Sequence, residues 1–153
     1  MNSENHQVHL KQASVFDIPV LIRLEKSVTG MKNSSIVPST VAEWVEDLKN
    51  GVVYLLEKDD IVVGDVMYEK KKENHIQITG LVVTPEFQRQ GIAREAMNQV
   101  LEELKNIKRI DLVTHPDNVH ALKLYQSLGF VIESRKENYF GDGEPRLVLV
   151  LEK

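Results

Sequence analysis

Cysteine is absent from the 153-residue sequence, which excludes disulfide bonds, thiolate zinc sites and a cysteine nucleophile. A concentrated basic stretch is absent as well. The 19 Lys and Arg residues are scattered among 23 Asp and Glu residues, and the formal net charge is −4. Because a face that binds nucleic acid needs clustered positive charge, no nucleic-acid partner is expected.

No run of apolar residues approaches the length of a membrane span. Residues Met1 to His6 also lack the charged-then-apolar pattern of a secretory leader. We therefore predict a cytoplasmic protein without a membrane partner. No cluster of His and acidic residues resembles a ligand set, so no metal is expected either.

What the chain does contain is an ordinary globular composition, with 42% hydrophobic and 27% charged residues. The length suits one hydrophobic core, and no internal repeat or linker divides the chain. We predict a single domain over residues 1–153, in which the polar residues 1–6 are frayed.

Strand patterns and helix patterns alternate along the chain. Helical spacing of apolar residues follows Asp17 and Ser39, which are expected as N-caps. An acidic turn at residues 58–60 favours an antiparallel hairpin in which Gly64 marks a bulge, and residues 70–73 are expected at another turn. The patterns predict strands at 8–13, 52–56, 61–68, 76–83, 110–115, 130–132 and 147–151, and helices from 17 to near 30, 39–51, 92–104 and 118–128.

The stretch of residues 81–93 organises the rest of the chain. An apolar strand ends at Pro85, and a short polar turn with its only glycine at Gly91 opens directly into a helix. The first turn of a helix presents unpaired backbone N–H groups and the positive end of the helix dipole. Because Gly91 lets a ligand approach the backbone closely, the stretch predicts an anion site between strand and helix.

The strand before this turn loses its two-residue alternation near Gly80. Residues 76–80 alternate apolar with polar, whereas Leu81 to Val83 are all apolar, and a broken phase beside glycine predicts a β-bulge. A bulge leaves backbone groups unpaired, so a ligand with amide groups could lie there as an extra strand. Coenzyme A, with amides at one end and phosphates at the other, fits this description. The strand and helix terminus alone fit other nucleotides equally well.

The turn itself resembles a family signature. Gln88-x-x-Gly91-x-Ala93 follows a strand that ends V-x-P, and it resembles the Q/R-x-x-G-x-G/A signature of the GCN5-related N-acetyltransferase (GNAT) family. Two positions depart from the commonest form of that signature. Gln88 stands where arginine is commoner, and Ala93 replaces the second glycine.

A second motif, from Asn118 to Phe130, resembles the segment that follows in the same family, with an asparagine at a helix start and Tyr125 seven residues on. Together the two motifs cover roughly residues 76–132. The resemblance implies a mixed α/β fold in one GNAT-like domain. Its central sheet would have six or seven mostly antiparallel strands, with a parallel pair splayed around the coenzyme A site and about four helices.

The resemblance also implies site residues, with acetyl-CoA as co-substrate. Main-chain groups of Leu81 to Val83 would bind the pantetheine arm and orient the thioester, and the turn that begins at Gln88 would hold the pyrophosphate. Asn118 would bind pantetheine, and Tyr125 would be the general acid that protonates the departing thiolate. The implied cofactor contacts are Leu81, Val82, Val83, Gln88, Arg89, Gln90, Gly91, Ile92, Ala93, Asn118 and Tyr125.

Simpler roles exist for these side chains. A tyrosine on the apolar face of a helix is usually a core residue, and an asparagine at a helix start is usually an N-cap. Arg89 and Arg94 could be surface charges, although we expect Arg89 to help neutralise phosphate. His115 before a proline is expected as a strand-end residue rather than a base.

The general base stays open. An amine with a pKa near 10 must lose a proton before it attacks the acetyl carbonyl. Glu69, Glu73 and His75 lie on or near central strands, but the positions where relatives carry a helpful carboxylate hold Gln77 and Thr79 here. A water relay through backbone carbonyls is the alternative.

The acceptor is the least determined part. The tail around Tyr139 resembles the ribosomal-protein-alanine N-acetyltransferase branch, which implies that Tyr139 contacts substrate. The expected function is transfer of an acetyl group by direct attack in a ternary complex to a protein N-terminus or a small-molecule amine. A non-catalytic acyl-CoA-binding module and an unrelated nucleotide-binding protein are the alternatives.

A monomer or a homodimer fits the sequence. Leu147 to Leu151 is apolar on both faces, which burial explains as well as a sheet continued across two protomers.

Overall fold

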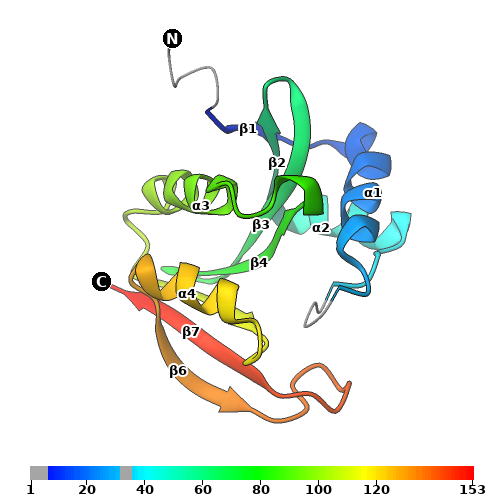
Figure 1. Cartoon of the computed structure of the whole chain (residues 1–153). Coiled ribbons are helices and arrows are strands. Elements are labelled where there is room, and N and C mark those ends of the chain that lie inside the picture. Colours follow the sequence, from blue (N-terminus) through cyan, green and yellow to red (C-terminus); the bar gives the residue numbers. More distant parts are fainter. Residues whose placement is uncertain (1–6, 32–35) are drawn as a thin grey trace.

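The computed structural model describes residues 7–31 and 36–153. The predicted fraying of residues 1–6 lies outside these ranges, as do residues 32–35, which follow the first predicted helix. The described chain forms a seven-stranded sheet in the order β1-β2-β3-β4-β5-β7-β6 with four α-helices around it (Figure 1). The strands are β1 (His9–Gln12), β2 (Gly51–Lys58), β3 (Ile61–Lys72), β4 (His75–Val83), β5 (Arg109–Thr114), β6 (Val131–Lys136) and β7 (Arg146–Glu152). The helices are α1 (Ile18–Val28), α2 (Val41–Asn50), α3 (Ile92–Glu103) and α4 (Val119–Ser127).

The sheet is antiparallel except where β4 meets β5, which confirms the predicted mixed fold. This pair is parallel because α3 carries the chain from the end of β4 back to the start of β5. The pairing joins only residues 75–77 to residues 109–111. The second half of β4 is therefore paired with β3 alone.

The helices cover the two faces of the sheet. Apolar residues of α3 pack with those of β5 and β7 in one core, which includes Met97, Ile110 and Leu149. Leu21 and Leu24 of α1 and Trp44 of α2 pack in a second core on the opposite face. Figure 1 shows α3 and α4 in front of the sheet, α2 behind it and α1 at its right side.

The β2–β3 hairpin contains the bulge expected near Gly64. Register passes from Leu56 opposite Gly64 to Glu57 opposite Val62, so Val63 is the extra residue. A Cβ atom at position 64 would collide with the carbonyl oxygen of Val82. Glycine is required here because β3 and β4 approach too closely for a side chain.

Two local predictions are wrong, and a third is correct in position only. Thr40, rather than Ser39, caps α2, because Thr40 and Glu43 form a reciprocal capping box. Asp17 is the N-cap residue of α1 as predicted, but its side chain makes no capping bond to this helix and its carboxylate instead accepts a hydrogen bond from the Ser14 N–H. The β3–β4 turn lies at residues 73–74, because β3 continues as a strand through Lys72.

The last strand lies inside the sheet. β7 pairs with β5 on one side and with β6 on the other, so neither of its edges is open. Burial therefore accounts for its apolar character, and Leu149 and Val150 are 0% and 4% exposed. A sheet continued across two protomers through this strand is excluded.

Candidate functional site

The candidate site begins where β4 separates from β5. Register against β3 passes from Met67 opposite Gly80 to Tyr68 opposite Ile78, so Thr79 is an extra residue on β4. The predicted bulge is confirmed and lies one residue before Gly80. Beyond it, Leu81 to Val83 pair with β3 only, and their other edge faces the gap left by β5. Backbone groups on this edge can bond a ligand that lies alongside as a strand.

The start of α3 lies at the end of this edge. Gly91 is the N-cap residue with φ 82°, and no side chain caps the helix. Donors of the first turn, from Ile92 onward, therefore keep their capacity for an anion, and the helix dipole adds positive potential. A Cβ built on Gly91 meets no atom within 4 Å, so the space above the turn is open. This geometry fits the phosphates of coenzyme A.

Two glutamine side chains form hydrogen bonds within the turn between β4 and α3. Gln88 Nε2 donates to the carbonyl oxygen of Val83 at 2.9 Å, and Gln90 Nε2 donates to that of Glu86 at 3.2 Å. The first bond ties the turn back to the end of β4. The signature residue Gln88 therefore fixes the angle between strand and helix.

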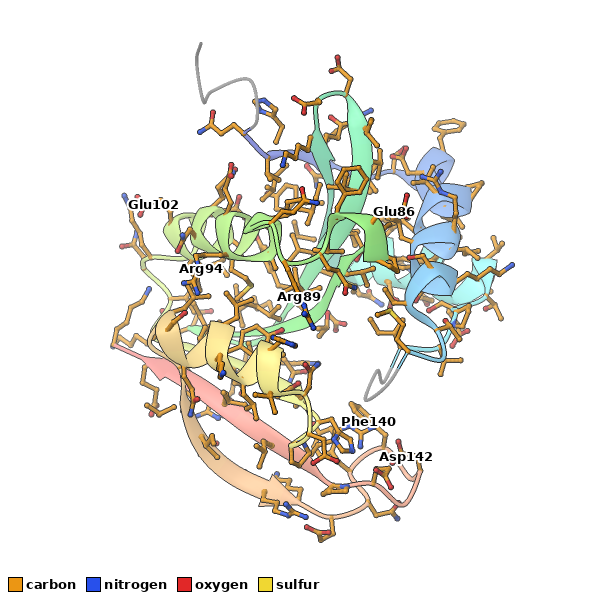
Figure 2. The ribbon with its side chains drawn as sticks, viewed as in Figure 1. Glu86, Arg89, Arg94, Glu102, Phe140 and Asp142 are labelled. Atoms are coloured by element: carbon orange, nitrogen blue, oxygen red, sulfur yellow. The ribbon has the colours of Figure 1, made fainter. Side chains whose placement is uncertain are left out.

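Arg89 joins the two sequence motifs in space. It adopts φ 63°, a left-handed conformation that is uncommon outside glycine, and its Nη2 atom lies 2.8 Å from Nε2 of His120 on α4. Figure 2 shows Arg89 between the starts of α3 and α4, whereas Arg94 lies further along α3. The turn therefore lies against the helix that carries Asn118 and Tyr125.

Asn118 caps α4, since its Oδ1 atom accepts from the Ala121 N–H at 3.2 Å. Its side-chain NH₂ group keeps two donors that this cap does not use. The cap and the implied contact with pantetheine are therefore compatible.

Tyr125 packs its ring against the main core and stands edge-on to Phe130, with 6.1 Å between ring centroids. Burial raises the pKa of Tyr125 to about 12. The hydroxyl therefore stays protonated throughout the neutral range, as a general acid must. The part of the chain that the structure describes gives this hydroxyl no hydrogen-bond partner.

Tyr139 lies on the loop between β6 and β7. The same loop carries Phe140 and Asp142, which are labelled in Figure 2. The Tyr139 ring meets Phe140 edge-on at 4.8 Å, and Phe140 in turn stacks on the Arg146 guanidinium at 5.0 Å. Tyr139 is 38% exposed. Its contact with substrate stays a prediction.

His115 directly follows β5, which ends at Thr114, one residue before the predicted strand end. Its Nδ1 accepts from the Asp117 N–H at 3.0 Å, and its Nε2 lies 2.9 Å from Glu144 Oε1. Both ring nitrogens are therefore engaged in holding the loops around them.

The three residues considered as bases do not meet at the bulge. Glu73 is exposed and pairs with Lys70, and Glu69 pairs with Lys71 at 3.6 Å. His75 stands at the opposite end of β4, where its Nε2 atom lies 2.8 Å from Asp111 Oδ2. None of them lies at the end of β4 that the candidate site occupies.

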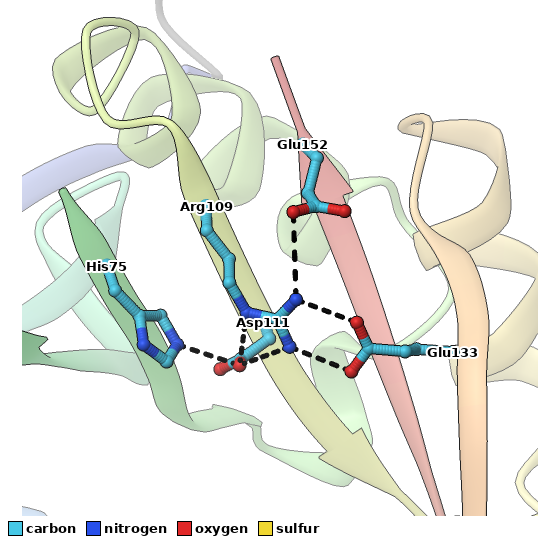
Figure 3. Close-up of polar contacts among 5 residues, drawn as sticks. All are labelled: His75, Arg109, Asp111, Glu133 and Glu152. Carbon is cyan, nitrogen blue, oxygen red and sulfur yellow. Dashed lines mark hydrogen bonds and ion pairs between the residues drawn. The ribbon is translucent and has the colours of Figure 1, made fainter.

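His75 instead belongs to a charge network across four strands, which we call the Arg109 network (Figure 3). Arg109 donates to Glu133 at 2.7 and 2.8 Å and to Asp111 at 3.2 and 3.3 Å. Glu152 lies 3.8 Å from the same guanidinium. The hydrogen bonds from Arg109 lower the pKa of Glu133. The network ties β4 and β5 to β6 and β7.

A pocket of about 220 Å³ between α1, α2, β3 and β4, here the acidic pocket, was not foreseen from the sequence. Three of its lining residues are carboxylic acids: Glu25, Asp47 and Asp65. It shares Thr79 and Gly80 with the bulged part of β4. It shares Val82 with the unpaired edge formed by Leu81 to Val83, which we call the cofactor edge, so the pocket lies directly beside the candidate site. The lining is completed by Ile36, Val37, Ser39, Trp44 and Met67.

Asp65 is the residue that sequence reasoning missed. It is 2% exposed, and burial together with the nearby charge of Glu25 raises its pKa to about 8. The signal was visible as one carboxylate inside the apolar run Val62-Val63-Gly64-Asp65-Val66-Met67. A buried strand seldom carries an unpaired charge, so such a residue indicates a function.

Two kinds of feature are absent from the described residues: a membrane-spanning helix and a metal-binding cluster. No helix in ranges 7–31 and 36–153 combines the length and apolarity that a bilayer crossing needs. The same ranges contain no group of three or more His, Asp and Glu side chains arranged to hold a metal ion.

The sequence matches the model of the Acetyltransferase (GNAT) family over residues 21–130. It is 30% identical over 76 residues to the N-terminal acetyltransferase B complex catalytic subunit NAA20 of Arabidopsis thaliana, a match that covers 48% of this chain and 44% of that protein. The chain spans about half the length of the curated relatives it matches.

Solved structures show the same fold. The ribosomal-protein-S18-alanine N-acetyltransferase of Escherichia coli superposes with a TM-score of 0.80 at 18% identity, covering 95% of this chain and 94% of that one. A GNAT family acetyltransferase from Elizabethkingia anophelis with acetyl-CoA bound superposes with a TM-score of 0.72 at 21% identity, covering 99% and 100%. At these identities the likeness establishes the architecture alone.

Proposed function

Because this chain belongs to the Acetyltransferase (GNAT) family, we propose that it is an acetyl-CoA-dependent N-acetyltransferase that acetylates a primary amine in a ternary complex. One observation carries the proposal. The edge of β4 that β5 leaves unpaired runs directly into the uncapped start of α3. A strand edge suits the amides of pantetheine, and a helix terminus suits its pyrophosphate.

Residues from the unpaired edge of β4 to the start of α3 would hold the co-substrate. Main-chain groups of Leu81 to Val83 would bind the pantetheine arm, and the turn from Gln88 to Ala93 would hold the pyrophosphate, with Arg89 adding positive charge. Asn118 has amide donors left for the arm after capping α4.

In the reaction, the amine nitrogen forms a bond to the acetyl carbon, the carbon–sulfur bond breaks, and the sulfur keeps the electron pair. Tyr125 would then give its hydroxyl proton to the sulfur, and the amine nitrogen would lose a proton to solvent or a nearby base. Burial keeps the Tyr125 hydroxyl protonated at neutral pH, which is the state from which a general acid starts.

The test measures release of free thiol from acetyl-CoA with a panel of amines that includes alanine-ended peptides, polyamines and aminoglycosides. Tyr125→Phe should lower kcat roughly 100-fold or more, because general acids typically contribute at least that factor, and should leave the Kd for CoA nearly unchanged. Tyr54→Phe is the matched control, since that hydroxyl bonds Glu103 at the C-terminal end of α3, whereas the candidate site lies at the start of this helix.

Unchanged turnover in Tyr125→Phe would remove the acid assignment. If CoA stabilises the protein against heat but no amine in the panel is acetylated, the protein is an acyl-CoA-binding regulatory module instead. Stabilisation by ATP or NAD and not by CoA would overturn the cofactor assignment itself.

A further inference from the structure

The acidic pocket contains a buried carboxyl group without a partner. Asp65 Oδ2 is inaccessible to solvent and forms no hydrogen bond within the described residues. Taking a carboxyl group out of water without a compensating bond is costly, and the raised pKa of Asp65 reflects that cost. A ligand that supplies a positive donor would relieve it.

No cation of the described chain compensates the charge in this pocket. Among the described lining residues there is no Lys, Arg or His. Among the described residues, the groups that donate hydrogen bonds to Glu25 are neutral: the backbone N–H and hydroxyl of Ser39 and Nε1 of Trp44. Burial, followed by the charges of Glu69 and Glu25, raises the pKa of Asp47. The pocket therefore attracts a cation and repels a carboxylate.

The negative charge of the acidic pocket also determines which nitrogen of the acceptor can bind in it. Carboxylates close to an amine favour its charged form, so a nitrogen bound in the acidic pocket stays an ammonium. An ammonium has no lone pair and cannot attack a thioester. The nitrogen that receives the acetyl group must therefore be a different one, outside the pocket and at the edge of β4.

Size and lining restrict the rest of the acceptor. A volume of about 220 Å³ is smaller than the roughly 300–1,000 Å³ typical of sites for drug-sized ligands. Trp44, Met67 and Val82 offer apolar surface to methylene groups. Thr79 and Gly80 connect the pocket with the bulge on β4. These features suit a narrow aliphatic chain with an ammonium at its end.

We propose that the acidic pocket binds one ammonium group of an aliphatic diamine or polyamine through Asp65, with Asp47 and Glu25 adding negative potential, while the other terminal amine is acetylated. This inference rests on the proposed function and names its substrate class. It assigns Asp65 to substrate binding.

The test uses three acceptors of matched length: 1,4-diaminobutane, n-butylamine and 4-aminobutanoate. They end in an ammonium, a methyl group and a carboxylate opposite the reacting amine. We expect kcat/KM to fall in that order, by about 10-fold or more at each step, because a hydrogen bond between charged groups has about that effect on binding. Equal values for the three acceptors, or preference for 4-aminobutanoate or a peptide N-terminus, would overturn the proposal.

Variants locate the effect. Asp65→Asn preserves shape and should raise KM for 1,4-diaminobutane about 10-fold or more, with KM for acetyl-CoA and kcat/KM for n-butylamine nearly unchanged. Asp47→Asn, on the pocket's α2 side, should act in the same direction more weakly. Asp60→Asn is the matched control, because it removes an equal charge at the exposed β2–β3 turn. If Asp65→Asn and Asp60→Asn behave alike, the assignment of Asp65 is wrong.

A binding measurement separates this inference from the proposed function. Without acetyl-CoA, 1,4-diaminobutane should raise the melting temperature of the wild-type protein and not that of Asp65→Asn. If this shift occurs but no acetyl transfer is found, the pocket assignment stands and the enzymatic proposal fails. If transfer to amines is found but the diamine neither binds nor depends on Asp65, the reverse holds.

Discussion

Two groups of carboxylates lie on the face of the sheet opposite α3 and α4, and they differ in whether a cation opposes them. In the Arg109 network, Asp111 is 5% exposed and its charge is met by Arg109 and His75. In the acidic pocket, Asp65 is as deeply buried, and no cation of the described residues faces it. A buried carboxylate that is paired with an arginine holds neighbouring strands together. A buried carboxylate without a partner can still bind a ligand.

The largest change in stability is expected from breaking the Arg109 network. Arg109→Met would leave Asp111 buried with only His75 beside it. We expect a loss of about 3 kcal/mol in the free energy of unfolding, near the lower end for a broken buried ion pair, because the Arg109 side chain is 26% exposed. Denaturant unfolding measures it.

Arg135→Met is the control for that variant, because its partner Glu137 lies at the surface and both side chains are more than half exposed. Its effect should stay below about 1 kcal/mol. If the two arginine variants lose equal stability, the Arg109 network is no more than a surface arrangement and the contrast with the acidic pocket disappears.

The next change in stability is expected from neutralising Asp65 in the acidic pocket. The pKa of Asp65 is raised to about 8 by burial and by Glu25, so the native state keeps this proton while the unfolded chain releases it near pH 4. The unfolded state then binds fewer protons, and this group lowers stability as pH rises from about 4 through about 8. Asp65→Asn cannot release a proton, so its stability relative to wild type should rise with pH across that window, by up to about 1.4 kcal/mol for each pH unit.

Melting curves at pH 5 and pH 8 measure this gain, with Asp60→Asn as the equal-charge control at an exposed site. Glu25 and Asp47 are the other titratable groups that line the pocket with Asp65, from α1 and α2. A variant of Asp65 that is less stable than wild type at pH 8 would show that the carboxylate has a partner in the native protein.

The smallest effect is expected at Glu25, whose charge is met by neutral donors. In Glu25→Gln the amide oxygen can still accept from the Ser39 N–H and from Trp44 Nε1. We expect a loss of about 1 kcal/mol at pH 5, where charge-assisted bonds become neutral ones. The loss should shrink at pH 8, because Asp65 then ionises without an opposing charge nearby.

Chemical unfolding at the two pH values tests this, with Glu73→Gln at the exposed β3–β4 turn as the control that should change stability by less than about 0.5 kcal/mol. A loss at Glu25→Gln that grows with pH would contradict the assigned coupling to Asp65.

Local chemistry made much of the fold and of the cofactor edge predictable. Periodicity and turn residues place the helices and the bulge beside Gly80, and the cap at Asn118 follows from side-chain preference. The misplaced cap at Ser39 has a tertiary cause. Ser39 is drawn to Glu25, fourteen residues earlier, and Thr40 takes its place.

By itself, therefore, the sequence determined the family, the order of elements and the strand-turn-helix line from Leu81 to Ala93, because each depends on neighbours within a few residues. Only the tertiary structure decided that β7 lies inside the sheet and that Asp65 shares a pocket with Glu25 and Asp47. Those three acids come from β3, α1 and α2, and no periodicity links them. The net charge of a pocket depends on which elements pack together and on which of their charged side chains lack a partner of opposite charge. Both are properties of the folded chain.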